Sequence, residues 1–248
     1  MSINRERKWH DDLARKGFRS RRLVQRLTRP FYNQRIMWGP IFREMGDLAG
    51  RRVLDYGCGR GKFALLLAAR GAQVIGIDIS KEVFTRVARG KGQGSGQVQF
   101  VVGDAHQTGL ASGLFDFVVG NGILHHLDVT RSYREVHRLL KPGAKAFFVE
   151  PLASHPLLRA IRALTPSART RDEHPLRFAD IDGARSIFSC VEHRELFLLS
   201  VAIFPLALFS PRTASLLLAL LRPLDQLIFR VIPATRRYAW VTVITLVR

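Results

Sequence analysis

Three glycines at alternate positions follow a short apolar run, in the sequence Val53-Leu54-Asp55-Tyr56-Gly57-Cys58-Gly59-Arg60-Gly61. Glycine reaches positive φ without steric cost, and its missing Cβ lets a ligand lie against the backbone. A helix predicted over about residues 62–69 would point its free N–H groups into the same turn. This succession of strand, glycine turn and helix is typical of an α/β fold that holds a ligand at the turn.

The spacing of the turn restricts the kind of ligand. A dinucleotide-binding turn has the pattern Gly-x-Gly-x-x-Gly, whereas the third glycine here, Gly61, comes one residue early. Asp55 lies two residues before the first glycine, where its carboxylate would repel a pyrophosphate but would suit a cationic amino-acid head group. Residues 74–78 predict a second buried strand ending in Asp78, and an acid at this place can accept the hydroxyls of a ribose.

These motifs resemble those of the class I S-adenosylmethionine-dependent methyltransferases, especially the small-molecule enzymes of ubiquinone and menaquinone biosynthesis. The first motif of that family is an acid-x-Gly-x-Gly-x-Gly turn, and the second is an acid at the end of strand two. Three later segments continue the resemblance in the family's order, namely residues 98–105, 115–127 and 139–151. The matched segments cover roughly residues 50–151, and an ordered set of five is far more specific than one glycine motif.

The resemblance implies a Rossmann-like α/β fold. The sheet would have seven mostly parallel strands, helices on both faces and an antiparallel last strand. The alternation of apolar runs with helical segments over residues 51–150 predicts the same parallel sheet. Residues 191–199 and 239–247 match the antiparallel sixth and seventh strands of the family, and a helical apolar insertion is expected between them.

We expect an N-terminal helical cap over residues 1–50, with helices interrupted at Pro30 and Pro40. The methyltransferase domain would follow over residues 51–248. Acceptor-side helical insertions within that domain are predicted at residues 151–190 and 200–237.

The resemblance also implies which residues bind S-adenosylmethionine at the carboxyl ends of strands one to four. Asp55 would hold the methionine ammonium and Asp78 the ribose hydroxyls. Asp104 would face the adenine edge, and Asn121 would lie beside the methionine moiety. For any one acid, a helix cap or a surface loop is an equally good interpretation. The expected cofactor-binding residues are Asp55, Gly57, Cys58, Gly59, Gly61, Asp78, Ile79, Asp104, Ala105 and Asn121.

Two histidines, His125 and His126, follow the fourth predicted strand at the mouth of the cleft. Methyl transfer to oxygen or nitrogen can need a base near neutral pH, and histidine suits that task. Successive residues cannot easily face one site, so one would pack, and we favour His126 slightly as the base; a purely structural role for both stays open. The expected acceptor pocket contains Glu150, His155, Glu173 and His174. No spacing in this set is diagnostic of a metal, and none is expected.

The formal net charge of +19 favours an anionic partner, either nucleic acid or acidic lipid, unless the arginines only coat solvated faces. Two cysteines are too few for a disulfide framework, and no secretory signal is visible, so we expect a cytoplasmic protein. The apolar segment at residues 200–237 is broken by Pro205, Pro211 and Arg212 and is a poor candidate for a membrane span. A lid, a dimer interface and an interfacial contact with the inner face of an anionic membrane stay open for it.

The sequence therefore predicts a methyltransferase acting on a small, hydrophobic acceptor. One alternative is a nucleic-acid methyltransferase. The loop at Asn121-Gly122-Ile123-Leu124 argues against it, because it lacks the prolines and the aromatic ring of base-methylating enzymes. A second alternative is a non-catalytic membrane-surface protein that retains the fold, and the intact cofactor motifs argue against that.

Overall fold

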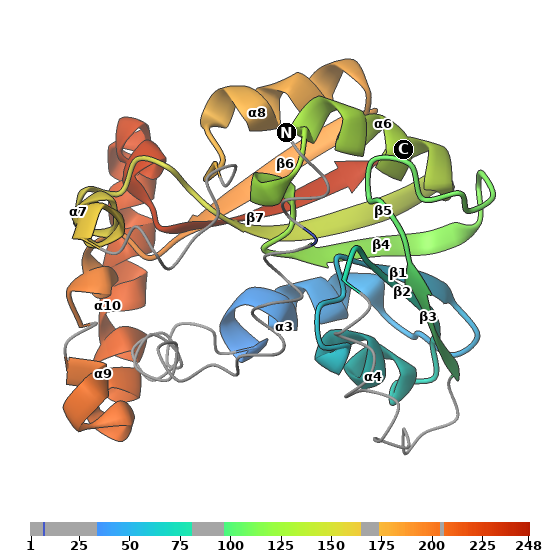
Figure 1. The fold of residues 1–248 in the computed structure, drawn as a ribbon. Coiled ribbons are helices and arrows are strands. Elements are labelled where there is room, and N and C mark those ends of the chain that lie inside the picture. The colour runs from blue at the N-terminus through green and yellow to red at the C-terminus, as the bar shows by residue number, and fades with distance from the viewer. Residues whose placement is uncertain (1–6, 8–33, 81–96, 165–173, 204–205) are drawn as a thin grey trace.

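The computed structural model describes residues 7, 34–80, 97–164, 174–203 and 206–248. Its strands form one seven-stranded sheet in the order β3-β2-β1-β4-β5-β7-β6 (Figure 1). The strands are β1 (Arg52–Tyr56), β2 (Gln73–Asp78), β3 (Gln97–Val102), β4 (Phe115–Asn121), β5 (Leu140–Pro151), β6 (Cys190–Leu196) and β7 (Val241–Val247).

The strand directions confirm the predicted Rossmann-like sheet. β7 pairs antiparallel with both β5 and β6, and the other pairs of neighbouring strands are parallel. The order reverses between β1 and β4, so the carboxyl ends of these two neighbours form a topological switch point. Ligands of open α/β sheets bind at such a point, outside the carboxyl ends of the strands.

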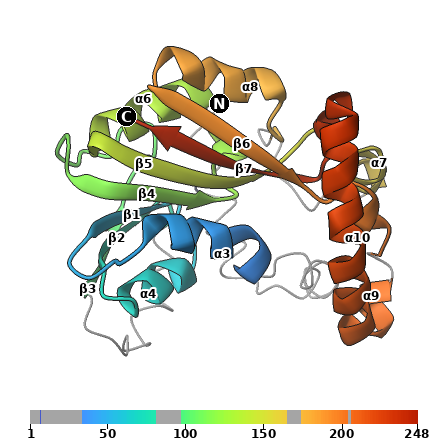
Figure 2. The same ribbon diagram turned by 180° about the vertical axis from the view of Figure 1, so that it is seen from behind.

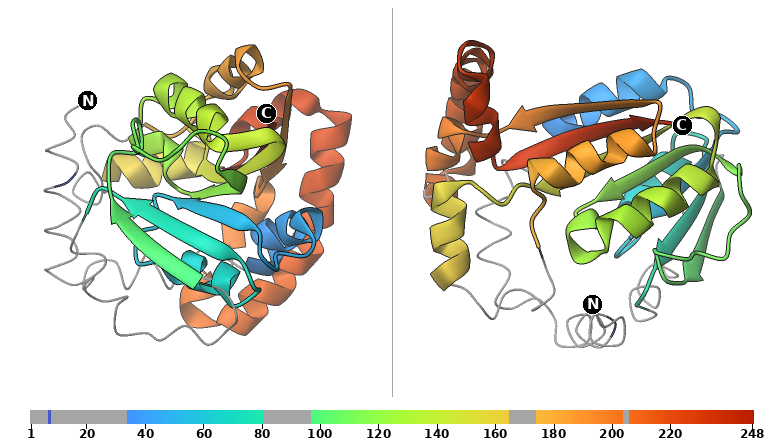
Figure 3. Two further views of the ribbon diagram at one scale, coloured as in Figure 1. Left: turned by 90° about the vertical axis from the view of Figure 1, so that its right-hand side faces the viewer. Right: turned by 90° about the horizontal axis from the view of Figure 1, so that it is seen from above.

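Helices cover both faces of the sheet. α3 and α4 lie on one face, and α6 and α8 lie on the other (Figures 1 and 2); the right panel of Figure 3 shows α6 and α8 from above. The α-helices are α3 (Gln34–Met45), α4 (Lys62–Ala68), α6 (Val129–Leu139), α7 (Pro156–Leu164), α8 (Phe178–Gly183), α9 (Leu206–Phe209) and α10 (Pro211–Val231). Short 3-10 helices are η2 (Leu124–His126), η4 (Ala184–Ser186), η5 (Leu199–Ile203) and η6 (Pro233–Tyr238).

The sheet divides the apolar interior into two cores. Successive residues of a strand point to opposite faces, so Val53 of β1 packs in the core that contains α3 and α4. Leu54 packs in the other core, with Tyr133 of α6 and Phe148 of β5. Because β1 is buried on both faces, its carboxyl end is held firmly where the glycine turn begins.

The prediction that Pro40 interrupts a helix is wrong, because Pro40 lies inside α3. Proline removes one backbone hydrogen bond and normally kinks or breaks a helix. Here Met37, Trp38 and Ile41 are each 2% exposed, and their burial against the sheet favours the helix over the break. The remainder of the predicted cap, residues 1–33 apart from Arg7, lies outside the described residues.

The apolar insertion between β6 and β7 is helical, as predicted, and comprises η5, α9, α10 and η6. It stands with α7 at the carboxyl end of the parallel strands, at the left of Figure 1. Ser210 caps α10 by accepting a hydrogen bond from the Thr213 N–H, at 3.4 Å. Within the part of the chain that the structure describes, no helix combines the length and apolar character that a membrane crossing requires.

A buried carboxylate fixes α10 to the rest of the domain. Asp225 is 1% exposed and accepts hydrogen bonds from the Leu198 N–H at 3.0 Å and the Leu199 N–H at 2.8 Å. The Ser200 hydroxyl donates a third bond, at 2.6 Å. Asp225 thus satisfies the free donors at the start of η5, which sets the rotation of α10 about its own axis.

Replacing this carboxylate should destabilise the domain. In Asp225→Ala, the buried donors of Leu198, Leu199 and Ser200 lose their acceptor. We expect a loss of about 3 kcal/mol in the free energy of unfolding, measured by urea denaturation. Asp182→Ala is the control, because this carboxylate is 61% exposed in its pair with Arg185 and should change stability little. Equal stabilities of the two variants would contradict the anchoring role.

Candidate functional site

The turn after β1 needs its glycines for two different reasons. Gly57, Gly59 and Gly61 have φ values of +73°, +48° and +66°, a region that favours glycine. A Cβ on Gly57 would lie 2.5 Å from the Ile123 side chain, so this glycine is required by packing against the loop after β4. A Cβ on Gly59 would meet nothing within 4 Å, so the backbone at Gly59 borders open space.

Backbone hydrogen bonds fasten the turn to the end of β2. The N–H groups of Gly57 and Cys58 both donate to the Ile77 carbonyl, each at 2.9 Å. Cys58 is 7% exposed, and burial, together with the nearby Asp55 and Asp78 carboxylates, raises the pKa of its thiol well above the ordinary value. The thiol therefore stays protonated near neutral pH and acts as a small filler within the turn.

Asp55 places a buried carboxylate directly behind the turn. Its side chain is 2% exposed, and its Oδ2 has no hydrogen-bond partner among the described residues. Burial raises the pKa of Asp55 to about 7, the Ala64 N–H lowers it in part, and the Asp78 charge raises it. A buried oxygen without a partner is costly, and a cationic or hydrogen-bond-donating ligand at the turn would satisfy it.

Asp78 lies at the tip of β2 and is half-buried. Its Oδ2 accepts a hydrogen bond from the Gly59 N–H at 2.9 Å, and its Oδ1 accepts one from the Ser80 N–H at 3.0 Å. A carboxylate oxygen can accept a second bond, so both oxygens retain capacity for a ligand's hydroxyls. Ile79 follows at the bend after the strand and is also half-buried.

His106, which is not among the predicted site residues, joins the tip of β3 to the start of α6. His106 Nδ1 lies 2.8 Å from Asp104 Oδ1, and its Nε2 accepts a hydrogen bond from the Asp128 N–H at 2.9 Å. These contacts set one tautomer, with the ring proton on Nδ1. Ala105 is held by its carbonyl, which accepts a hydrogen bond from the Tyr56 hydroxyl. The signal in the sequence is a histidine two residues after the strand-end acid.

The loop after β4 is organised by the buried Glu150 at the end of β5. Its Oε1 accepts hydrogen bonds from the N–H groups of Ile123 and Leu124, both at 2.9 Å. Its Oε2 lies 2.7 Å from Nδ1 of His125, and the Glu150 side chain is fully buried. A carboxylate on Nδ1 holds the proton at that nitrogen and leaves Nε2 as the hydrogen-bond acceptor of the ring.

This geometry singles out His125 rather than His126 as the oriented histidine. The two rings lie 4.2 Å apart between centroids at an angle of 38°, and Glu150 Oε2 lies 2.7 Å from Nδ1 of His125. The His125 side chain is 10% exposed. Asn121, at the end of β4, is exposed at the same edge of the sheet.

The other expected acceptor residues fall in different places. His174 is exposed, and its N–H donates to the His125 carbonyl at 2.8 Å, which brings the segment after α7 to the loop after β4. His155 Nε2 lies 3.1 Å from the Leu198 carbonyl, so this ring contacts the start of the helical insertion. Glu173 lies outside the described residues. No group of three or more potential metal ligands occurs in the described part of the chain.

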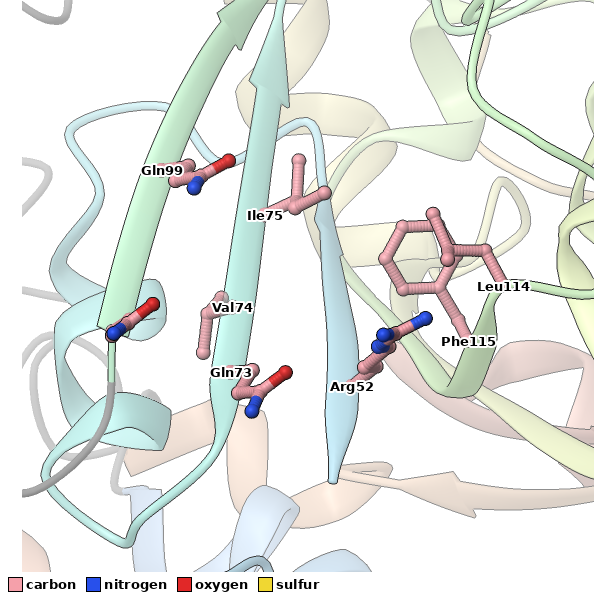
Figure 4. A pocket seen from close by; sticks show the side chains of 8 residues that line it. Arg52, Gln73, Val74, Ile75, Gln99, Leu114 and Phe115 are labelled. Carbon is pink, nitrogen blue, oxygen red and sulfur yellow. The ribbon is translucent and has the colours of Figure 1, made fainter. Parts of the chain in front are cut away.

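A separate hollow of about 300 Å³ lies over the amino-terminal ends of the strands (Figure 4). Arg52, Gln73, Gln99 and Phe115 contribute to its lining. This hollow and the glycine turn lie at opposite ends of the strands. This hollow therefore does not include the polar groups at the carboxyl ends of the strands, namely Asp55, Asp78, Asp104 and the His125–Glu150 pair.

Known proteins with a related sequence share the central segment. Residues 54–148 match a family model described as "Methyltransferase domain". A ubiquinone biosynthesis O-methyltransferase of Xanthomonas oryzae is 43% identical over 104 residues, which are 41% of this chain and 43% of that protein. A demethylmenaquinone methyltransferase of Lactococcus lactis is 31% identical over 133 residues, 51% of this chain and 52% of that one. The chain thus spans about half of these relatives or less.

Solved structures resemble a larger part of the chain. Phosphoethanolamine N-methyltransferase 2 of Haemonchus contortus, solved with S-adenosyl-L-methionine, aligns over 90% of this chain and 56% of that one, with a TM-score of 0.60 and 18% identity. An S-adenosylmethionine-dependent methyltransferase from Mesorhizobium loti aligns over 84% of this chain and 96% of that one, with a TM-score of 0.56 and 24% identity. At these identities the likeness shows the fold.

The strand order, the glycine turn and the matched segment all indicate the same fold. Residues 54–148 match a methyltransferase-domain model, and the sheet to which they belong has the fold of the solved S-adenosylmethionine-dependent methyltransferases.

Proposed function

We propose that this protein binds S-adenosylmethionine at the carboxyl ends of β1 to β4 and methylates a small, hydrophobic acceptor. The observation that carries the proposal is the buried Oδ2 of Asp55, which lacks a partner among the described residues and lies directly behind the glycine turn. The cofactor supplies a methyl group activated on a sulfonium. Asp55 would receive its ammonium, Asp78 its ribose hydroxyls, and the tip of β3 at Asp104 its adenine.

The His125–Glu150 pair favours an acceptor that loses a proton, such as a hydroxyl group. Among the described residues, His125 has hydrogen-bond partners at Nδ1 and at its carbonyl, and none at Nε2. Nε2 would take up the hydroxyl proton, while Glu150 would stabilise the imidazolium that forms. The quinone-related names of the two relatives support an acceptor that is aromatic and apolar.

The acceptor class can be tested directly. The full chain is incubated with methyl-labelled S-adenosylmethionine and separate lipid, polar and RNA fractions of a cell extract. We expect label in the lipid fraction. Label only in RNA would instead favour nucleic-acid methylation, and label only in the polar fraction would overturn the hydrophobic acceptor.

Asp78 should contribute to cofactor affinity through the ribose. We expect Asp78→Ala to abolish binding of S-adenosylmethionine and Asp78→Asn to weaken it by about tenfold to a hundredfold, in isothermal titration calorimetry. Asp78 also anchors the Gly59 N–H, so a ribose contact needs a separate test. An S-adenosylhomocysteine analogue without ribose hydroxyls should lose much less affinity in Asp78→Asn. Equal losses for both ligands would overturn the ribose assignment.

Asp55 should link cofactor affinity and stability to pH in opposite directions. Its pKa is about 7 in the folded protein, against 3.8 for a solvated aspartate, so its ionisation lowers stability as pH rises between these values. Ligand-free Asp55→Asn should therefore melt higher than the natural chain at pH 8, and the difference should vanish near pH 4. S-adenosylmethionine should bind the natural chain more tightly at pH 7 than at pH 5.5, because the ammonium requires the ionised carboxylate. Asp55→Asn should bind weakly at both pH values.

A second carboxylate gives a control of opposite sign. Burial raises the pKa of Asp116, but the Lys141 ammonium and the Arg52 N–H outweigh it and hold the pKa below the ordinary value. Asp116→Asn should therefore melt lower than the natural chain at pH 8. If Asp55→Asn also melts lower at pH 8, the ionised Asp55 does not carry the cost we assign to it.

Glu150 should act by holding the tautomer of His125. In Glu150→Gln the carbonyl can keep the N–H groups of Ile123 and Leu124, while the amide donates to Nδ1 and moves the ring proton to Nε2. We expect turnover to fall by about a hundredfold or more, as for loss of a general base, with the affinity for S-adenosylmethionine unchanged. Natural turnover in both Glu150→Gln and His125→Ala would rule the pair out of the chemistry.

A further inference from the structure

The outer face of α10 carries a row of exposed apolar side chains. Leu216, Leu220, Leu224, Leu227 and Val231 are between 42% and 69% exposed. Their spacings of four, four, three and four residues place them on one face of the helix. We call these five side chains the apolar stripe. Just before the helix, Phe209 is 84% exposed.

The orientation of this face is fixed by the opposite side of the helix. Ala214, Leu218, Asp225 and Phe229 are each at most 3% exposed, and they turn toward the domain. Asp225 adds the hydrogen bonds to the start of η5 described above. Rotating α10 to bury the stripe would break these contacts, so the stripe is a stable feature of the surface. A row of this size needs a partner, since isolated exposed apolar residues are common but contiguous ones are not.

A basic groove continues from the carboxyl end of the stripe. Ile232, which is 53% exposed, follows Val231, and the next residue, Pro233, lines a groove of about 440 Å³. Arg177, Arg236 and Arg237 also line this groove. The Arg177 N–H donates to the Asp180 carboxylate, and Arg177 also lines the groove. The groove thus joins an apolar row to three arginines, and guanidinium groups suit phosphate oxygens. Nε of Arg236 donates to the Phe229 carbonyl and Nε of Arg237 to the Ala234 carbonyl, which orient these two side chains.

The exposed charged side chains of residues 206–239 are all positive. Residues 206–239 contain the five arginines Arg212, Arg222, Arg230, Arg236 and Arg237, and their only acid is Asp225. That acid is 1% exposed and satisfied inside the domain. Arg212 and Arg230 are exposed. Arg212 lies four residues before Leu216, and Arg230 lies one residue before Val231. With about 3.6 residues per turn, both arginines fall along the same edge of the stripe. An apolar helix face bordered by arginines is the pattern of a helix that lies in an anionic membrane interface.

We propose that the apolar stripe and the basic groove together form a docking face for an anionic phospholipid bilayer. The stripe would enter the boundary between headgroups and acyl chains, and Arg177, Arg236 and Arg237 would contact lipid phosphates. α10 stands at the carboxyl end of the parallel strands (Figures 1 and 3), and the glycine turn and His125 follow β1 and β4 at that same end. Docking would therefore bring the methyl-transfer edge to the membrane, where a hydrophobic acceptor is dissolved.

Vesicle flotation tests this docking face without any cofactor or acceptor. The full chain is mixed with vesicles of phosphatidylcholine alone, or of phosphatidylcholine with phosphatidylglycerol. We expect flotation with the anionic vesicles only, and a decrease as salt concentration rises. Flotation with neither vesicle, or equal flotation with both, would overturn the proposal.

Two sets of variants separate the contributions of the stripe and the groove. Leu216→Gln/Leu220→Gln/Leu227→Gln should lose flotation by tenfold or more, whereas the same three positions changed to Met should retain it. Arg177→Gln/Arg237→Gln should weaken binding by about fivefold per arginine. The charge-matched control is Arg131→Gln/Arg134→Gln, exposed positions on α6, which should float like the natural chain. Equal weakening by both arginine pairs would mean that only net charge matters and would overturn the groove assignment.

The variants also separate docking from folding, from the proposed function and from self-association. Each variant should bind S-adenosylmethionine as the natural chain does, which shows that the fold is intact and that the membrane effect is separate from cofactor binding. The natural chain should sediment as the same species as the Leu→Gln variant. If the natural chain is instead a dimer that the Leu→Gln variant dissociates, and neither floats, the stripe is a contact between two copies and the membrane proposal fails.

Discussion

The parallel register of β1 with its two neighbours is the constraint on which the candidate site depends. Tyr56 of β1 is paired with Ile77 of β2 and with Gly120 of β4, so the three strands end at one level. The residues that follow, Gly57, Asp78 and Asn121, are therefore presented at one edge. A parallel sheet buried on both faces cannot shift this register without exposing its apolar side chains, and so the edge is rigid before any ligand binds.

Buried carboxylates organise the loops at that edge, and one of them differs from the others. Glu150 and Asp225 each accept two backbone N–H groups and one side-chain contact, so the cost of burying their charge is offset by hydrogen bonds. Asp55 is buried as deeply, yet one of its oxygens has no partner within the described residues. The proposed cationic ligand at the glycine turn would supply the missing partner.

The glycine turn and the strand-end acids lie together as the sequence predicts, and the ligands of these residues and of the acceptor side stay predictions. The alternating glycines and strand-end acids are local patterns, and each lies where the parallel sheet requires it. The slight preference for His126 over His125 as the base stays a prediction, since adjacent histidines look alike in a sequence. The structure adds that Glu150, twenty-five positions later, contacts His125. His106 was missed for a similar reason, since its second partner is the N–H of Asp128 at the start of α6. Pro40 lies inside α3 because the burial of Met37, Trp38 and Ile41 outweighs the local preference of proline.

The sequence by itself determined the fold class and the nature of the expected cofactor, because glycine conformation and strand periodicity are properties of short segments. The tertiary structure alone decided which histidine is oriented and which face of α10 is exposed. Both depend on long-range contacts made by a buried carboxylate, Glu150 in one case and Asp225 in the other. In the sequence, residues 211–231 are a mainly apolar run with a few charged residues; the anchor at Asp225 divides them into a face that packs and a face that is exposed.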